Sequence, residues 1–288
     1  MIKFYNTMKK VFFSVMAAML LLPSAAFAKK VSGPATLEVI SFNIRMGEGQ
    51  DGTNSWQFRC PATIYMLRDQ QPDIFGLQEA YDYQVQFISD NMPEYKNVGV
   101  GREDGKHKGE HMSIFWNKKK IALRKWGTFW LSETPDKPSK GWDAACFRTA
   151  TWALMKDKRT GHEFYYVNTH LDHVGKTAQK EGLALIVKRI QEINPEGLPM
   201  VLTGDFNVSS DDPVLDDLDR MMKSARSSAE RTDNLNSFNG WGRDTTSIID
   251  YIYYSGFSSC PQFETVQKKY ADRPFISDHY PVKAILIF

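Results

Sequence analysis

Acidic, amide and imidazole side chains stand at the ends of several apolar segments of this 288-residue chain. Taken singly, a strand-end Asn or Asp is usually a turn former, and an isolated His is usually structural. Together such groups can bind a metal ion, orient water and transfer protons, so one shared site explains them better than six unrelated turns. In chain order the six positions are Asn43, Glu79, His170, Asp205 with Asn207, Asp250, and Asp278 with His279.

Asp250 is the most informative of these positions, because it lies inside the apolar run 248–252. A carboxylate in such a strand is costly to bury unless a partner compensates its charge. His279 is the expected partner, since an imidazole can carry the opposite charge and be held by it. The sequence therefore predicts a carboxylate–imidazole pair between Asp250 and His279.

The elements that must position these groups are mostly strands, because many segments are rich in β-branched and aromatic residues. Helices are expected over Trp56–Asp69, around Val85–Ile88, and within Thr177–Ile193, where Leu183, Ile186, Ile190 and Ile193 form one apolar stripe. Many strands and few helices predict one domain with a large β core flanked by helices. The expected strands are Leu37–Ile44, Ile74–Leu77, Ser113–Trp116, Ile121–Leu131, Phe147–Met155, Glu163–Leu171, Pro199–Leu202, Ile248–Tyr253 and Val282–Phe288.

Residues 1–28 have the pattern of a secretory signal peptide. Lys3, Lys9 and Lys10 precede the 12-residue apolar run Val11–Leu22, and Ala26–Ala28 supplies a small-residue cleavage site. This run is shorter than the roughly 20 residues that span a bilayer as a helix, and no later segment is long enough to do so. We expect a single domain over residues 29–288, exported to the periplasm or secreted, without a transmembrane segment, and monomeric.

Charge and cysteine content narrow the chemistry further. The chain has 36 basic and 34 acidic residues, and loss of the three leader lysines leaves 33 against 34. Cys60, Cys146 and Cys260 allow at most one disulfide and form no CxxC pair, which disfavours a thiolate zinc site. We expect them to be buried structural residues.

Six short runs around the polar positions occur in one order along the chain and resemble the endonuclease/exonuclease/phosphatase superfamily. This group includes pancreatic-type deoxyribonuclease, abasic-site endonucleases, bacterial sphingomyelinases and inositol-polyphosphate phosphatases. The resemblance implies a DNase I-like α+β fold: a four-layer sandwich of two packed, mostly antiparallel β-sheets flanked by helices, with the site at one edge. The runs are Ser41–Arg45, Gln78–Glu79, Asn168–Asp172, Gly204–Asn207, Ile249–Ile252 and Ser277–His279.

The resemblance also implies a divalent metal. Asn43 and Glu79 offer the hard oxygen ligands that suit Mg²⁺ or Mn²⁺, and Asp278 is assigned to a second metal position. Such a metal neutralises phosphate charge and stabilises the transition state of phosphate-ester hydrolysis.

Catalytic roles follow from the same resemblance. Asp205 is expected to polarise the attacking water, and Asn207 to orient that water or a phosphoryl oxygen. Asp250 would fix the tautomer of His279, which contacts the scissile phosphate or relays a proton. Which group acts as base and which as acid stays open at this point.

Four further residues complete the expected site. His170 resembles the second active-site histidine of the deoxyribonuclease branch, and Glu110 occupies the place of its glutamate partner. Arg148 matches a phosphate-contacting arginine, with an ordinary surface salt bridge as the alternative. Trp142 lies in a turn-rich loop and would stack on a sugar or base, or pack on its own sheet.

The substrate class is the least determined property. A duplex nuclease needs a basic surface, whereas the only dense basic run is Lys118–Lys120 with Arg124 and Lys125, which suits a protected edge strand. No loop stands out as the apolar membrane contact of a sphingomyelinase. An exported Mg²⁺- or Mn²⁺-dependent hydrolase of a small phosphate ester (sugar, inositol or nucleotide) is therefore favoured. An extracellular nuclease is the first alternative, and a non-catalytic exported binding protein the second.

Overall fold

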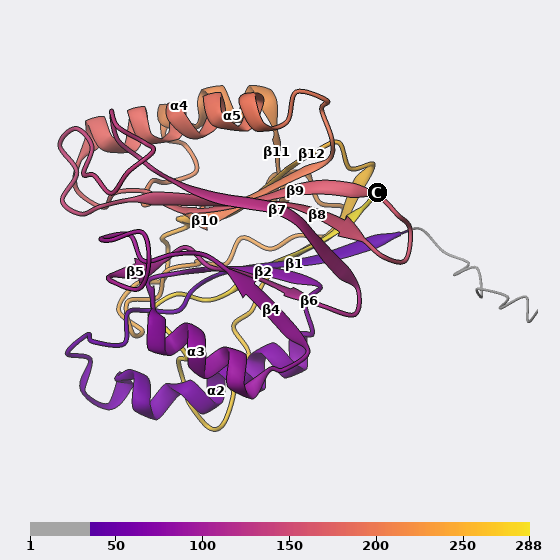
Figure 1. Ribbon diagram of the computed structural model, residues 1–288. Coiled ribbons are helices and arrows are strands. Elements are labelled where there is room, and N and C mark those ends of the chain that lie inside the picture. The colour runs from indigo at the N-terminus through magenta and orange to yellow at the C-terminus, as the bar shows by residue number, and fades with distance from the viewer. Residues whose placement is uncertain (1–34) are drawn as a thin grey trace, which may run out of the picture. The chain divides into compact units, whose positions relative to one another are not determined.

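The computed structural model describes residues 35–288, and the predicted signal peptide lies outside this range. Two six-stranded sheets pack face to face, and helices cover the outer face of each (Figure 1). The order of layers is helices, sheet, sheet, helices. The predicted α+β four-layer sandwich is therefore confirmed for the part of the chain that the structure describes.

The first sheet has the strand order β13-β14-β1-β2-β6-β4. All neighbours are antiparallel except β1 and β2, which run parallel with Asn43 opposite Gln78. The strands are β1 (Thr36–Asn43), β2 (Ile74–Gln78), β4 (Tyr95–Val98), β6 (Ile114–Asn117), β13 (Ser259–Thr265) and β14 (Val282–Ile287).

The second sheet has the order β11-β12-β10-β9-β8-β7, and its one parallel pair is again central, between β9 and β10. Its edge strand β7 directly follows the Lys118–Lys120 run, as expected for lysines that protect a sheet edge. The strands are β7 (Ile121–Trp130), β8 (Thr149–Asp157), β9 (Glu163–His170), β10 (Met200–Asp205), β11 (Lys223–Ser224) and β12 (Asp250–Ser255). A separate small sheet pairs β3 (Ala80–Tyr81) with β5 (Glu110–His111).

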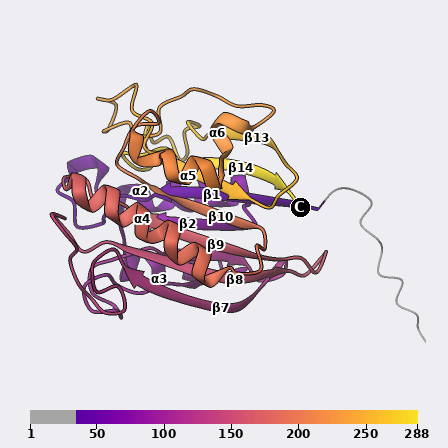
Figure 2. The same ribbon diagram turned by 90° about the horizontal axis from the view of Figure 1, so that it is seen from above.

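The helices bury apolar stripes against the outer sheet faces. On α4, Leu183, Ile186 and Ile190 are buried as predicted, and Ile193 packs partly buried beside them. Figure 2 looks down on α4 and α5, which lie across the strands of the second sheet. The helices are α2 (Trp56–Gln70) and α3 (Asp82–Asn91) on the first sheet, α4 (Lys176–Ile193) and α5 (Asp216–Met221) on the second, and α6 (Ala225–Ser228). Two 3₁₀ turns are η1 (Gly52–Asn54) and η2 (Pro213–Leu215).

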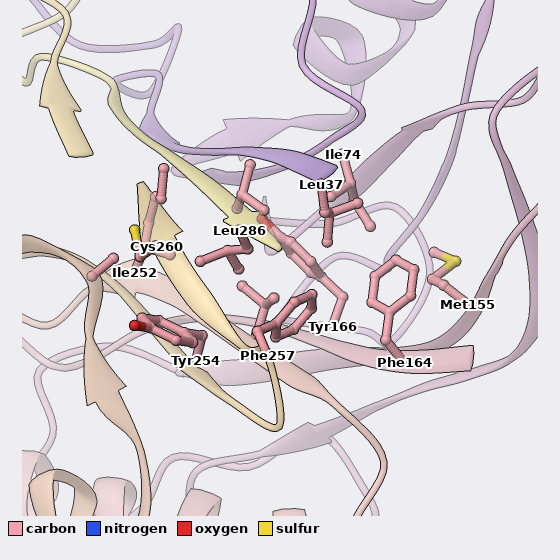
Figure 3. Close-up of a cluster of buried hydrophobic side chains, with 14 of the residues drawn as sticks. Leu37, Ile74, Met155, Phe164, Tyr166, Ile252, Tyr254, Phe257, Cys260 and Leu286 are labelled. Atoms are coloured by element: carbon pink, nitrogen blue, oxygen red, sulfur yellow. The ribbon is translucent and has the colours of Figure 1, made fainter. Parts of the chain in front are cut away.

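A hydrophobic core between the sheets holds the sandwich together (Figure 3). Leu37, Phe164 and Leu286 are fully buried there, and each such side chain stabilises the fold by about 1.5–3 kcal/mol. The ring of Tyr166 packs in this core, and its hydroxyl donates a hydrogen bond to the carbonyl of Ile40 at 3.2 Å. This apolar layer fixes how the two sheets face each other, and thereby the edge at which their strands end together.

The strand boundaries differ from the predictions at two functionally informative places. Asp250 is the first residue of β12 rather than an interior one, although it is buried as expected. The strand β13 was not predicted, because Pro261 and a bulge between Ser259 and Gln262 break the regular strand pattern.

Two sequence expectations concern the cysteines and the membrane. All three cysteines are free, and only Cys260 is buried, so the expectation of burial is wrong for Cys60 and Cys146, which are partly exposed. Within residues 35–288, no helix combines the length and the apolar character that crossing a bilayer requires.

Candidate active site

The central parallel pairs of both sheets end at the same edge, and the predicted polar residues stand there. Asn43 ends β1 and Glu79 follows β2, while His170 and Asp205 end β9 and β10. Asp250, at the start of the antiparallel neighbour β12, lies opposite Asp205 in the register. The sandwich therefore brings together residues that are far apart in the sequence.

His279 lies between two buried carboxylates. Its Nδ1 is 2.9 Å from Asp250 Oδ2, and its Nε2 is 3.6 Å from Asp205 Oδ2. Burial lowers the pKa of an imidazole, but here the two carboxylates outweigh burial and raise the pKa of His279 to about 10. The two carboxylates therefore favour the protonated imidazole, and the contact with Asp250 that the sequence predicts is present.

Asp205 is a buried carboxyl group with four close polar neighbours: Asn43, Asn207, His170 and His279. Its Oδ2 accepts from Asn43 Nδ2 at 3.0 Å, and its Oδ1 accepts from the backbone N–H of Asn207 at 3.0 Å. Burial, followed by the opposing effects of the His279 and Asp250 charges, raises the pKa of Asp205 to about 7. A carboxyl group with a pKa near the working pH is suited to take a proton from water.

Asn43 bridges two acidic residues. Its amide nitrogen donates to Glu79 Oε1 and to Asp205 Oδ2, each at 3.0 Å, while its oxygen accepts from the backbone N–H of Arg45. Burial would raise the pKa of Glu79, but hydrogen bonds from Asn43 and the Met46 backbone and the charge of His279 lower it. Asn43 thus aligns the acids through its nitrogen, and its predicted role as a metal ligand stays a prediction.

Glu79 and Asp278 form the acidic side of the site. Arg45 Nη1 lies 3.9 Å from Glu79 Oε2, and Arg45 Nε lies 3.6 Å from Asp278 Oδ2. The same guanidinium makes two 3.0 Å hydrogen bonds to Asp51, so that one arginine faces three carboxylates. Burial and the charge of Glu79 raise the pKa of Asp278. This excess of carboxylate oxygens fits a divalent cation such as Mg²⁺ or Mn²⁺.

A second group of ligating atoms comes from Asp205, Asp250 and His279, whose atoms lie within 4.8 Å of one another. A metal-binding imidazole must be neutral and offer a lone pair. In His279, Nδ1 contacts Asp250 and Nε2 faces Asp205, so both ring nitrogens already face carboxylates. We therefore favour Glu79 and Asp278 as metal ligands over this triad.

His170 faces three polar side chains, Asn207 and Asp205 at Nε2 and Glu110 at Nδ1. Nε2 lies 3.0 Å from Asn207 Nδ2 and 3.4 Å from Asp205 Oδ2; because the amide nitrogen can only donate, the shorter contact favours the tautomer with its proton on Nδ1. Burial, then the charges of Arg148 and Arg102, lower the pKa of His170 well below its ordinary value, which agrees with a neutral ring. Nδ1 is 4.0 Å from Glu110 Oε2, so the expected His170–Glu110 hydrogen bond is not formed.

Glu110 is paired with a different residue, Arg102. Arg102 Nη1 donates to Glu110 Oε2 at 2.6 Å, and both side chains are buried. Arg148, also buried, contacts Asp172 Oδ2 through Nε at 3.4 Å and His173 Nδ1 through Nη2 at 3.0 Å. Arg148 therefore forms a buried ion pair with Asp172 within the site, and the alternative of a surface salt bridge is wrong.

Most of these groups line a cavity of about 530 Å³ at the sheet edge, whereas Asn43, Asp172 and Asp250 lie outside its lining. Trp142 is not part of the lining, so its contact with substrate stays a prediction. The lining residues are Arg45, Met46, Glu79, Arg102, Glu110, Cys146, Arg148, His170, His173, Asp205, Asn207, Phe238, Ser247, Ile249, Asp278 and His279.

Arg59 and Arg102 are the residues that the sequence did not reveal. Arg59 lies in α2 and is fully buried, yet the hydrogen bonds of its guanidinium all go to backbone carbonyls. These carbonyls belong to Ile44, Arg45, Asn54 and Ile276. Arg59 therefore joins the loop that carries Arg45 to the one that carries Asp278. Arg45, in contrast, ends the run Ser41–Arg45 that carries part of the family resemblance, so a place in the site could have been predicted for it from the sequence.

Comparison with known proteins gives a consistent result. The model of the endonuclease/exonuclease/phosphatase family matches residues 40–279. A mannosyl-6-phosphatase from Bacteroides thetaiotaomicron is 36% identical, with a TM-score of 0.83 and coverage of 88% of this chain and 100% of that chain. An endonuclease/exonuclease/phosphatase from Bacteroides vulgatus is 38% identical, with a TM-score of 0.81 and coverage of 88% and 98%. The catalytic domain of human Nocturnin, 18% identical with a TM-score of 0.69 over 88% and 94%, shares the fold.

Proposed function

Because the chain belongs to the endonuclease/exonuclease/phosphatase family, we propose that it is a metal-dependent hydrolase of a small phosphate monoester, with a phosphorylated sugar as substrate. The observation that carries this proposal is the buried arrangement of Asp205, His279 and Asp250, of which Asp205 and His279 line the cavity and Asp250 contacts His279 from behind. It combines a carboxyl group suited to accept a proton with an imidazolium suited to contact a phosphate.

The size and charge of the site support a small substrate. A cavity of about 530 Å³ lies within the range of pockets that enclose small molecules. The near-balance of basic and acidic residues in the whole chain gives no long-range attraction for a polyanion such as DNA. The mannosyl-6-phosphatase, 36% identical over nearly the whole domain, has a phosphorylated sugar as its named substrate.

Each polar residue of the site has its own role in the proposed hydrolysis. The imidazolium of His279 donates a hydrogen bond to a phosphoryl oxygen, and Asp250 holds the ring in place. Asp205 takes the proton of the attacking water, while Asn207, fixed by its contact with His170, orients the phosphate or the water. These roles agree with the pKa of each group, since Asp205 titrates near neutral pH and His279 stays protonated.

Glu79 and Asp278 would hold the divalent cation, with Asn43 keeping Glu79 in position. When bound, the cation supplies positive charge that stabilises the phosphate in the transition state. The structural reason to expect a bound cation is that Glu79, Asp278 and Asp51 share a single arginine, Arg45.

We also propose that the protein is exported, on the pattern of residues 1–28. N-terminal sequencing of the protein recovered from outside the cytoplasm should begin at Lys29. Recovery of the chain only from the cytoplasm, with the leader intact, would contradict export.

A substrate panel tests the proposed activity. It includes hexose 6-phosphates, p-nitrophenyl phosphate, bis-p-nitrophenyl phosphate, plasmid DNA and sphingomyelin, each with Mg²⁺, Mn²⁺ or EDTA. We expect phosphate release from the hexose phosphates with either metal and none in EDTA. Cleavage of DNA or the diester, with no phosphate released from any monoester, would instead support the nuclease alternative.

A further inference from the structure

One end of the cavity contains polar groups that the proposed hydrolysis does not use. We call this end the Arg102 lobe and define it by Arg102, Glu110, Cys146, Arg148 and His173, all of which line the cavity. Glu110 stands on β5, and Arg148 directly precedes β8, the neighbour of β9 in the second sheet.

The positive charges of the lobe are already compensated. Arg102 is paired with Glu110 at 2.6 Å, and Arg148 with Asp172 at 3.4 Å. Asp172 also accepts backbone N–H groups from both sides, those of Ala145 and Cys146 and those of Val174 and Gly175, so it holds Arg148 firmly. Together with Asp172, which lies beside the lobe, the two arginines face two carboxyl groups, so neither guanidinium is left over to attract a second anionic group.

Two buried donors nevertheless lack a partner among the described residues. Arg148 Nη1 has no hydrogen-bond acceptor, although only 5% of the residue is exposed. His170 Nδ1, which carries the ring proton, is likewise unpaired and lies 4.0 Å from Glu110 Oε2. Leaving a buried donor unsatisfied costs about 1–3 kcal/mol, so such donors next to a cavity indicate the place of a ligand acceptor.

From this arrangement we infer that the Arg102 lobe binds the hydroxyl groups of the sugar part of the substrate. A hydroxyl both accepts and donates, so it can satisfy Arg148 Nη1 while donating to the carboxylate of Glu110. The inference rests on the proposed function, because it places the sugar relative to a phosphate held near His279.

Other ligand groups fit the lobe less well. A second phosphate would need uncompensated positive charge, which the two ion pairs remove. A nucleobase stacks most strongly on Phe, Tyr or Trp, and none of the five residues of the lobe is one of these, although His173 is aromatic. The aromatic and aliphatic lining residues Phe238 and Ile249 lie elsewhere, with Phe238 packed edge-on to His279 at 4.9 Å between ring centres.

The test compares a substrate with hydroxyl groups and one without them. Steady-state kcat/KM is measured for a hexose 6-phosphate and for p-nitrophenyl phosphate with the wild-type protein, Arg102→Lys and Glu110→Gln. Arg102→Lys keeps the positive charge but loses the planar guanidinium, so the Tm of each variant is compared with that of the wild type to confirm that it is folded. Ser247→Ala is the control, because Ser247 also lines the cavity but its hydroxyl donates to Asp244, outside the lobe.

We expect the ratio of kcat/KM for the sugar phosphate to that for p-nitrophenyl phosphate to fall about tenfold or more in both lobe variants. In Ser247→Ala the ratio should stay within about twofold of wild type. If the lobe variants lower kcat/KM equally for both substrates, the lobe acts through His170 on the hydrolysis itself, and hydroxyl binding is refuted. If the wild-type protein hydrolyses neither monoester, the proposed function fails first and the inference fails with it.

Discussion

Replacement of Asp250 by Asn tests how the site controls the charge of its imidazole. The amide keeps the shape of the carboxylate and can still accept from His279 Nδ1, but it removes the negative charge. In the structure, the hydrogen bond of the Asp250 carboxylate goes to His279, and its other oxygen has no partner among the described residues. The substitution therefore acts on His279 rather than on a set of backbone contacts.

The expected magnitude follows from the two distances. The carboxylates of Asp250, at 2.9 Å, and Asp205, at 3.6 Å, together keep the pKa of His279 at about 10 in spite of burial. Loss of the nearer charge should lower that pKa by roughly two pH units, or about 3 kcal/mol. If His279 stabilises the transition state as an imidazolium, kcat should fall only about twofold at pH 8 and about tenfold at pH 9, in step with the protonated fraction of the ring.

Two assays measure this effect. The ring nitrogens of His279 are titrated by ¹⁵N NMR in EDTA, so that no added cation contributes to the charge of the site. The kcat profile on p-nitrophenyl phosphate is measured in parallel, and its alkaline limb should move to lower pH in Asp250→Asn. A folded variant with wild-type activity and an unmoved His279 titration would refute the pairing.

Further predictions concern the metal, the water-activating group, the stability of the site and its pH dependence. EDTA should abolish hydrolysis and Mg²⁺ should restore it while raising the Tm, and Glu79→Gln should remove the rise in Tm; full turnover in chelator would contradict this. Asp205→Asn should lower kcat about 10²-fold or more with little loss of Tm, because it removes a buried charge as well as a base; near-wild-type kcat would exclude Asp205 as the base. Arg59→Met should lower the free energy of unfolding by about 3 kcal/mol, because several backbone carbonyls lose their donor; an unchanged urea midpoint would show that water replaces the guanidinium. Because the pKa of folded His279 is raised, its contribution to stability is complete below about pH 6.5 and is lost as the pH rises toward 10. The Tm values of wild type and His279→Ala should therefore differ most at low pH. A difference in Tm that does not depend on pH would contradict the raised pKa.

The predictable part of this site consists of polar residues at strand ends. Asn43, His170 and Asp205 end apolar strands whose residue types are clear, and parallel central strands must place their carboxyl ends at one edge. The pair of Asp250 with His279 followed from the cost of burying an isolated carboxylate, although β12 begins at Asp250 instead of surrounding it. Local pattern and the cost of burial were sufficient for these positions.

The remaining features depend on contacts between loops, which leave no periodic pattern in the sequence. Arg59 looks like an ordinary helix residue, because nothing near it shows that backbone carbonyls from two distant loops will surround its side chain. The pairing of Glu110 with Arg102 instead of His170 is a choice between two neighbours that only the folded geometry decides. The hydrogen-bonding direction of Asn43, through nitrogen to Glu79 and Asp205, is equally a result of where those acids lie.

The central claim is that water, activated within this site, attacks the phosphorus of a sugar phosphate. Hydrolysis of a hexose 6-phosphate in ¹⁸O-labelled water with Mg²⁺, followed by mass spectrometry of both products, tests it most directly. The account predicts one ¹⁸O atom in the released phosphate, none in the sugar, and a release by Asp205→Asn that is slower by about 10²-fold or more. Label in the sugar, or no phosphate release by the wild-type protein, would contradict it.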